Sequence, residues 1–313
     1  MSDVVRRVLR ESGEDLLEIL SERLAPTDLQ SLLLEVYRKR AEGIQPSQLL
    51  KQHEENRFVR PSVVSPITLL EFDRIAFSLA DPQFEPIELA PLSPLGTTAS
   101  LTTVSQNSVV PTARNTDVLS DPTNVMALEC ALRRKSLPDK STRLRLCCSE
   151  RVTRGQSLPL PKSWAHFKLF ALCSSGRDEG SHRFEVEELA SHIDFHLRLL
   201  LALREQGFSI GRIRVAISNF GDWPQAYEAV VSLLAHWESK VAIAPYQDRQ
   251  SGRTYYYPLC FQIHAEDLEG TEYFLADGGN TDWTQQLLSN KKERLSISGI
   301  GTERLCSVFA RGA

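Results

Sequence analysis

The sequence has no apolar run long enough to cross a bilayer and no apolar signal segment near Met1. A membrane-spanning helix needs about 20 mostly apolar residues, so we expect no membrane association. The six cysteines include no Cys-x-x-Cys pair, which is the spacing typical of metal and redox motifs. These absences predict a cytoplasmic protein with reduced thiols and no cysteine-bound metal.

An excess of positive charge is also missing. The chain has 36 Lys and Arg against 40 Asp and Glu, which gives a net charge of −4. Nucleic-acid-binding domains usually carry a concentrated positive charge, so we do not expect tRNA to be a partner. With 313 residues, 42% of them hydrophobic, the chain can bury a large core and still carry a smaller appendage.

Residues 1–56 are predicted to form a separate helical segment. Apolar residues recur there at helical spacing, for example at Leu29, Leu32 and Val36. Residues 57–313 are predicted to form the core domain, because strand-like and helix-like patterns follow one another throughout that part of the chain.

Within the core, the hydrophobic pattern predicts the main elements. Residues 141–154 and 164–173 are expected to form two strands joined by a polar loop, and residues 184–206 the clearest helix. The Thr/Ser-rich residues 96–108 are expected to form a pair of strands.

A block of glycines near the C-terminal end is the most informative part of the sequence. Asp277-Gly-Gly-Asn-Thr-Asp282 is expected to be a polar turn, and Ser298-Gly-Ile-Gly-Thr-Glu-Arg304 a strand that runs into a short helix. Gly299 and Gly301 would let a flat ligand lie on the backbone. Arg304 would then present its guanidinium to phosphate oxygens. The alternative is an ordinary strand-to-helix turn with a surface arginine.

An acid and a hydroxyl stand at the start of another predicted helix. Asp121 and Thr123 precede residues 124–134, whose apolar side chains fall on one helical face. Such groups either cap the free amides of the helix or bind the ammonium of an amino acid. The sequence leaves both interpretations open.

An arginine and a pair of tyrosines indicate further contacts with a ligand. Arg145 lies in a predicted strand, where it is either a phosphate ligand or a charge on a solvated face. Tyr255 and Tyr256 also lie in a predicted strand, where tyrosines normally pack with their hydroxyls at the edge. His192 and His196 are one helical turn apart, but no third ligand follows at useful spacing, so no metal site is predicted.

In order and spacing, these elements resemble the catalytic core of the class II aminoacyl-tRNA synthetases, and most of all the histidyl-tRNA synthetase group. The block of Gly299, Gly301 and Arg304 is similar to the third signature motif, and Gly278 and Gly279 to the turn before it. The resemblance covers most of the chain. It implies an α+β fold, in which a mostly antiparallel β-sheet is flanked by helices.

The resemblance also implies roles for individual residues. Strand, loop and strand at residues 141–173 are similar to the second motif, whose arginine grips the α-phosphate of ATP. The ATP-binding roles then fall on Arg145, Glu150, Phe170, Gly299, Gly301 and Arg304, of which Arg145 and Arg304 would also be catalytic. The amino-acid-binding roles fall on Asp121, Thr123, Tyr255, Tyr256, Gly278 and Gly279.

The sequence departs from the family pattern at three positions. Leu119 stands where the family has an arginine two residues before the acid, and Cys147 stands where the second motif has its acid. Ser251 stands where an arginine assists the chemistry, with Arg249 and Arg253 two residues to either side. A displacement of about 1 Å at a reacting group can cost on the order of a hundredfold in rate.

The intact motifs imply ATP-dependent adenylation of an amino acid or related carboxylate, with ATP and Mg2+ as cofactors and an unknown acceptor. The family also implies a homodimer. Because the chain ends just past the third motif, we expect no anticodon-binding domain. The alternative is a non-catalytic amino-acid sensor similar to the regulatory subunit of ATP phosphoribosyltransferase. A third hypothesis is a nucleic-acid-binding protein that uses the N-terminal helices.

Overall fold

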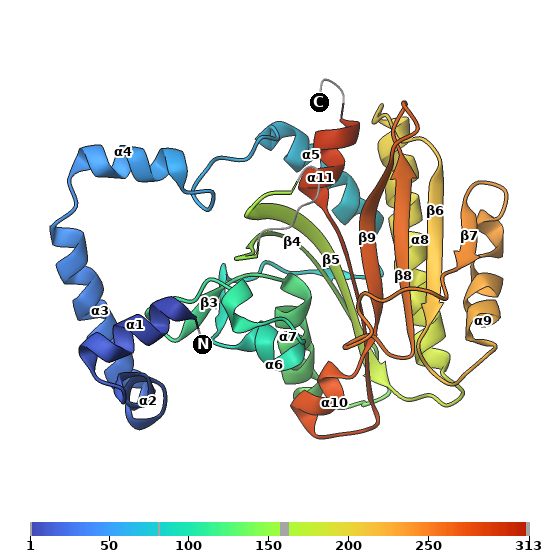
Figure 1. Cartoon of the computed structure of the whole chain (residues 1–313). Coiled ribbons are helices and arrows are strands. Elements are labelled where there is room, and N and C mark those ends of the chain that lie inside the picture. Colours follow the sequence, from blue (N-terminus) through green and yellow to red (C-terminus); the bar gives the residue numbers. More distant parts are fainter. Residues whose placement is uncertain (1, 81, 157–162, 311–313) are drawn as a thin grey trace.

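The computed structural model describes residues 2–80, 82–156 and 163–310 (Figure 1). In this part of the chain eight strands form one sheet, in the order β1-β4-β5-β10-β9-β8-β6-β7. The strands are β1 Glu85–Pro86, β4 Leu144–Thr153, β5 His166–Arg177, β6 Ile213–Asn219, β7 Ala242–Pro245, β8 Leu259–Glu266, β9 Glu272–Thr281 and β10 Glu293–Ile300. Neighbours are antiparallel except β1 with β4 and β6 with β7. The predicted α+β fold with a mostly antiparallel sheet is confirmed.

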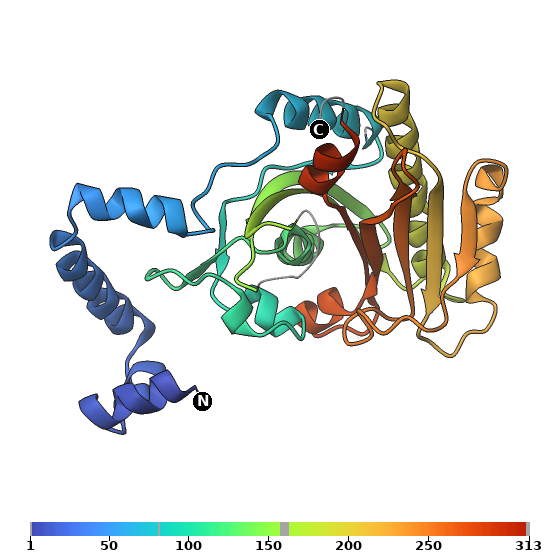
Figure 2. The same cartoon turned by 45° about the horizontal axis from the view of Figure 1, so that its top comes forward.

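Helices cover both faces of the sheet (Figures 1 and 2). The face that we call the α8 face carries α5 Pro66–Ala80, α8 Arg183–Glu205, α9 Ala226–Leu233 and α11 Thr302–Phe309. The opposite face, which we call the cavity face, carries α6 Thr97–Leu101, α7 Pro122–Ser136 and α10 Trp283–Leu288. Successive side chains of a strand point to opposite faces, so each strand contributes to both layers.

The predicted strands at residues 96–108 are wrong. This segment forms α6 and a 3-10 helix at Gln106–Ser108, while a two-stranded sheet forms from β2 Leu92–Pro94 and β3 Thr116–Val118. Gly96 begins α6 with φ 82°, a conformation that glycine adopts without steric cost. Hydroxyl groups then satisfy backbone carbonyls locally, since Thr97 bonds to Pro94 and Thr102 to Thr98, which favours a short helix over a strand.

The predicted turn at residues 277–282 is also wrong, because Gly278 and Gly279 lie inside β9 between β8 and β10. A Cβ atom at Gly278 would lie 2.5 Å from the Cβ of Ser298. Glycine is therefore needed there for close packing between strands and not for a turn. Tyr255 and Tyr256, expected within a strand, lie in the turn before β8.

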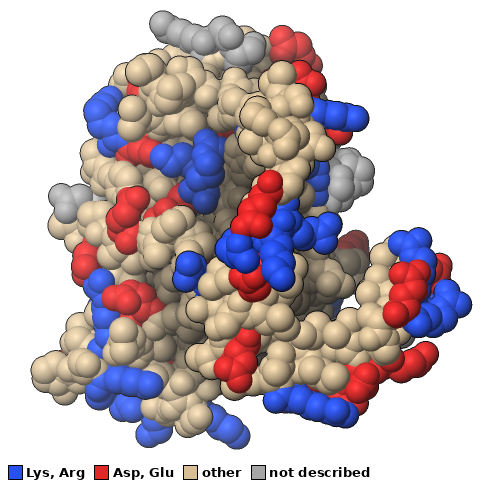
Figure 3. Space-filling view, turned by 90° about the vertical axis from the view of Figure 1, so that its left-hand side faces the viewer, with Lys and Arg blue, Asp and Glu red and all other residues tan. Residues whose placement is uncertain are grey.

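The N-terminal helices form an arm that stands away from the sheet (Figures 1 and 2). It consists of α1 Asp3–Ser12, α2 Leu16–Glu18, a π-helix Ile19–Arg23, α3 Pro26–Glu42 and α4 Pro46–Glu55. Leu9 is its one buried residue in the described range 2–56. Figure 3 shows charges of both signs on this side of the molecule, and Arg38 pairs with Glu35 and Glu42. The basic residues of α3 are thus interspersed with acids.

The last residues of the predicted core domain, 311–313, lie outside the described residues. None of the described helices combines the length and the apolar character that crossing a bilayer would require.

Candidate functional site

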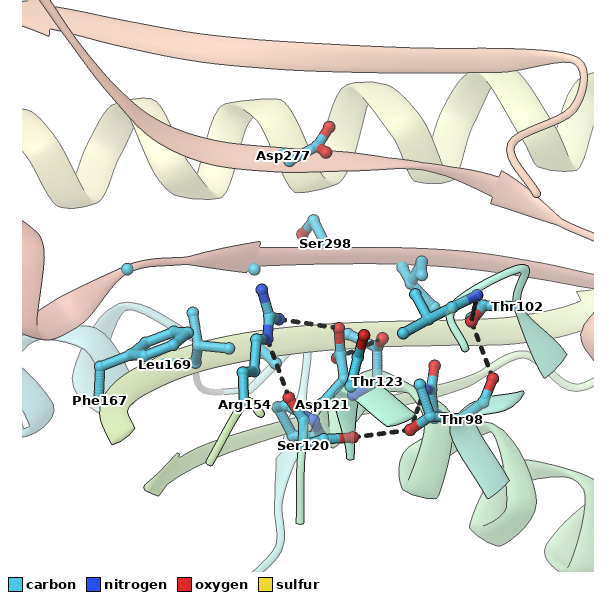
Figure 4. A pocket seen from close by; sticks show the side chains of 18 of the residues that line it. Thr98, Thr102, Ser120, Asp121, Thr123, Arg154, Phe167, Leu169, Asp277 and Ser298 are labelled. Carbon is cyan, nitrogen blue, oxygen red and sulfur yellow. Dashed lines mark hydrogen bonds and ion pairs between the residues drawn. The ribbon is translucent and has the colours of Figure 1, made fainter. Parts of the chain in front are cut away.

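A cavity of about 360 Å³ opens on the cavity face of the sheet (Figure 4). It is lined by residues of α6, α7, β5, β9, β10 and the start of α11. Of the residues with predicted roles, those that line it are Asp121, Thr123, Tyr255, Tyr256, Gly299, Gly301 and Arg304. The fold therefore brings together groups that lie up to 183 positions apart, since Asp121 and Arg304 border one space.

Asp121 both caps α7 and faces the cavity. One carboxylate oxygen accepts hydrogen bonds from the amide of Thr123 at 3.0 Å and from its hydroxyl at 2.8 Å. The other oxygen lies 3.3 Å from the guanidinium of Arg154. Because the Asp121 side chain remains 33% exposed, the two interpretations left open by the sequence are compatible: the acid can cap the helix and still accept a ligand ammonium.

Two arginines stand in the same cavity. Arg154 donates to the carbonyl of Ser120 at 3.2 Å and lies over the ring of Phe167. Arg304 donates to the carbonyl of Phe274 at 3.3 Å and has no carboxylate partner among the described residues. Burial, and next the charge of Arg154, lowers the pKa of Arg304. The two neighbouring cations outnumber the one acid that pairs with them, which favours an anion.

The cavity floor near Arg304 is bare backbone. A Cβ atom at Gly299 would have its nearest neighbour 3.7 Å away, and one at Gly301 would have it 3.6 Å away. Side chains would fit at both positions, so packing does not require glycine there. Because Gly299 and Gly301 have no side chains, the space above the strand stays open. A flat ring could lie on this surface beside Phe167 and Leu169, which line the same end (Figure 4).

An ion pair that the sequence did not predict, between a fully buried arginine and a partly exposed aspartate, borders the cavity. Asp277 lines the cavity, and its carboxylate accepts a hydrogen bond at 2.8 Å from the fully buried Arg249. Arg249 also donates to the carbonyls of Ser251 and Phe261. Burial raises the pKa of Asp277 although Arg249 opposes the change. Arg249 is therefore committed to Asp277 and the backbone, and does not replace the arginine missing at Ser251.

The tyrosine pair lies against this ion pair. Burial, and next the charge of Asp277, raises the pKa of Tyr255 to about 12. Tyr256 is 5% exposed and lies below the guanidinium of Arg249. Gly279 does not line the cavity, but a Cβ atom there would lie 2.6 Å from the Tyr256 ring. Gly279 thus supports the cavity indirectly, and Gly278 faces Ser298 on the α8 face.

Arg145, which was predicted to be a phosphate ligand, does not line the cavity. Its guanidinium forms two hydrogen bonds with the buried carboxylate of Glu188 in α8. Arg145 and Arg154 are nine positions apart, an odd separation, and side chains alternate between faces along an extended strand. Arg154, which continues the strand beyond Thr153, therefore faces the cavity when Arg145 faces α8. Arg154 is an even number of positions from the buried Leu146, so the two share one face of the strand. This spacing was the signal that could have identified Arg154 from the sequence.

Glu150 and Phe170, which were predicted to bind ATP, do not line the cavity either. Glu150 is buried at the edge of the sheet, where it accepts a hydrogen bond from the amide of Leu89 at 2.7 Å. Phe170 is fully buried on the α8 face, stacked on Phe195 with ring centroids 5.5 Å apart. Its strand neighbours on the opposite face line the cavity instead.

The described residues offer no ligand set for the expected Mg2+. Among them, no three His, Cys, Asp or Glu side chains are grouped so that they could hold a metal ion. The two carboxylates that line the cavity, Asp121 and Asp277, are engaged with Arg154 and Arg249.

No protein-family model matches the sequence, and no curated protein matches it. Solved structures match it in shape. A structure described as an ATP phosphoribosyltransferase regulatory subunit/histidyl-tRNA synthetase from Bacillus halodurans has a TM-score of 0.60 at 13% identity, over 81% of this chain and 83% of that one. Histidyl-tRNA synthetase from S. aureus has a TM-score of 0.59 at 14% identity, over 78% and 67%.

A histidine–tRNA ligase subunit from Alicyclobacillus acidocaldarius also matches, with a TM-score of 0.55 at 12% identity, over 79% of this chain and 95% of that one. Identities this low define the fold and not the activity. The chain has a class II synthetase-like core similar to that of histidyl-tRNA synthetases, as the resemblance in the sequence predicted.

Proposed function

We propose that this protein activates an amino acid or related carboxylate with ATP. The observation that carries the proposal is that one cavity holds cationic groups, bare backbone and an acid with a hydroxyl. Arg154 and Arg304 stand beside the bare backbone of Gly299 and Gly301, and Asp121 with Thr123 stands next to them. An aminoacyl adenylate has a phosphate and a ring at one end and an ammonium at the other, which complements this layout.

In the proposed reaction a carboxylate oxygen of the amino acid attacks the α-phosphorus of ATP. A bond forms between that oxygen and phosphorus, the bond to the bridging oxygen breaks, and pyrophosphate leaves with the bonding electrons. Arg154 would hold the α-phosphate oxygens, where charge builds up. Arg304 would hold the phosphates beyond it. Asp121 and Thr123 would fix the ammonium, so that the carboxylate lies in line for attack.

The direct test is amino-acid-dependent exchange of pyrophosphate into ATP by the purified protein, across all amino acids. We expect exchange with one amino acid or a small group of them. Arg304→Ala should slow it on the order of 10²–10³-fold, the usual effect of removing one group that stabilises transition-state charge. Arg212→Ala, which removes an exposed arginine, is the matched control and should leave the rate unchanged.

A sensor is the second candidate, and one observation favours it. The fully buried Arg249 is bound to Asp277 and to backbone carbonyls, so Arg249 does not take over the role expected of an arginine at the position of Ser251. A protein that binds an amino acid without activating it would tolerate that change. Calorimetric binding of an amino acid without any pyrophosphate exchange would establish the sensor and refute adenylation.

We also propose that the protein is a homodimer, because the fold is similar to cores that commonly pair. Light scattering on the full chain tests this directly. A mass near 70 kDa, about twice the chain mass of 35.2 kDa, would support it, and a mass near that of one chain would refute it.

A further inference from the structure

A second hollow of about 230 Å³ adjoins the cavity. Gln156, Ser163 and Trp164 line both spaces, so the two border each other. The hollow lies at the root of the arm, where the chain passes from α4 into α5. Its other lining residues are Arg57, Arg60, Pro61, Ala165, His166 and Glu303, and the sequence assigned a role to none of them.

The root of the arm is fixed to both walls of this hollow. The guanidinium of Arg57 donates to the carbonyl of Gly155, and a ring nitrogen of His166 bonds to the carbonyl of Arg60. Gly155 and His166 lie where β4 ends and β5 begins. The hydroxyl of Ser62 donates to Glu303 at the start of α11. These contacts hold the two arginines at the rim of the hollow.

Glu303, the acid that lines the hollow, already has hydrogen-bond and ion-pair partners within the protein. Glu303 is 1% exposed, and it accepts hydrogen bonds from the hydroxyl of Ser62, the amide of Lys168 at 3.0 Å and the guanidinium of Arg151 at 2.8 Å. A buried carboxylate with these donors is neutralised from within the protein. It therefore does not offset the charge of Arg57 and Arg60.

The two rim arginines have no carboxylate partner. Arg57 and Arg60 form no ion pair in the described part of the chain, and the Arg60 guanidinium forms no hydrogen bond there. His166 is held between Arg151 and the Arg60 carbonyl. Both ring nitrogens are therefore engaged within the protein. The hollow thus carries two uncompensated positive charges.

The position of the hollow indicates what those charges bind. Glu303 lines it, and the next residue, Arg304, lines the main cavity at its cationic end. We propose that the hollow is a phosphate-binding subsite with Arg57 and Arg60 as its ligands. Guanidinium groups match phosphate oxygens in geometry and charge. The phosphate belongs either to the tail of the nucleotide, released as pyrophosphate, or to the molecule that accepts the activated group.

Calorimetric titration of the full-length protein with inorganic pyrophosphate tests the subsite. We expect Arg60→Ala to weaken pyrophosphate binding on the order of tenfold, and the double variant Arg57→Ala/Arg60→Ala to weaken it further, because each removes a charge-assisted hydrogen bond. Arg40→Ala removes another exposed arginine of the arm and is the matched control. Arg60→Ala alone keeps the test decisive if loss of the Arg57 contact to Gly155 alters the fold.

The source of the phosphate follows from two further titrations. If ATP binding weakens in parallel while AMP binding does not, the subsite holds the nucleotide tail. If ATP binding is unchanged, and inorganic phosphate still binds to the ATP-loaded protein but not to the double variant, the subsite holds a phosphate of the acceptor. Either result stands even if no pyrophosphate exchange is found.

Three results would overturn the subsite. The wild-type protein could fail to bind pyrophosphate at millimolar concentration. The double variant, with an unchanged melting temperature, could bind it within twofold of wild type. The control Arg40→Ala could weaken binding as much as Arg60→Ala does, which would mean that only the overall charge matters.

Discussion

The two faces of the sheet are built from the same strands, yet Arg145 on one face and Arg154 and Arg304 on the other differ in how closely their charges are paired. On the α8 face the charge of Arg145 is paired with the buried Glu188, which Arg143 also contacts at 2.8 Å. On the cavity face Arg304 pairs with no acid in the described part of the chain, and Arg154 lies 3.3 Å from Asp121. A charge that is paired inside the protein is not available to a ligand, whereas a charge left unpaired in a cavity is available to one.

Apolar side chains show the same contrast. Phe170 on the α8 face is fully buried and stacked on Phe195. Its neighbour Leu169 faces the cavity and remains partly exposed. One residue therefore contributes mainly to stability and the next mainly to the shape of the site, although they are adjacent in the chain.

The largest effect on stability is expected from Phe170→Ala. Truncation of a buried phenylalanine costs about 3–5 kcal/mol, through lost transfer free energy and the cavity that remains. Leu169→Ala, on the other face, should cost less than about 1 kcal/mol because its side chain already borders open space. Urea denaturation of both variants measures the difference, and equal losses would contradict the contrast between the faces.

Arg154→Ala should produce the largest effect on ligand chemistry. We expect pyrophosphate exchange to fall on the order of 10²–10³-fold, or about 3–4 kcal/mol, while the melting temperature changes little. Arg145→Ala is the matched control on the opposite face. It should lower the free energy of unfolding by about 1–3 kcal/mol and leave the exchange rate within about twofold. The reverse result would restore Arg145 as the phosphate ligand.

The α8 face should also make stability depend on pH. Burial lowers the pKa of His192 to about 4, against the attraction of Glu188, and lowers that of His196 to about 3. Below about pH 6.5 these two histidines bind protons in the unfolded chain but remain unprotonated in the folded protein. The free energy of unfolding should therefore decrease as the pH decreases below about 6.5, by up to about 1.4 kcal/mol per pH unit for each histidine.

Denaturation between pH 7 and pH 5 checks this dependence, since most carboxylates remain ionised there. His192→Gln and His196→Gln replace the titrating rings by neutral amides, and each should reduce the slope. An unchanged slope in both variants would show that other groups cause it.

Ser298→Ala should give the smallest effect and the sharpest test of the two faces. The serine backbone borders the cavity, while its hydroxyl lies 2.9 Å from Nε2 of His196 on the α8 face. Loss of this hydrogen bond should cost about 1 kcal/mol of stability and leave pyrophosphate exchange unchanged. A large loss of exchange would mean that the hydroxyl serves the cavity after all.

Much of the fold could be predicted because it depends on local patterns. The long helix at Arg183–Glu205, the hairpin of β4 and β5 and the strand-to-helix passage before Arg304 follow from periodicity and from glycine positions. The strands expected at residues 96–108 could not be corrected from the sequence, because hydroxyl groups that bond to nearby carbonyls turn the segment into α6.

The sequence by itself determined the order of the elements and the residues at the two ends of the site. Asp121, Thr123, Gly299, Gly301 and Arg304 line the cavity because each stands at the start of a helix or at the end of a strand, and such positions are marked locally. The tertiary structure alone decided which residues of a strand face the ligand. A shift of one position reverses the face, so packing against α8 buried Arg145 and Phe170 and left Arg154 and Leu169 in the cavity.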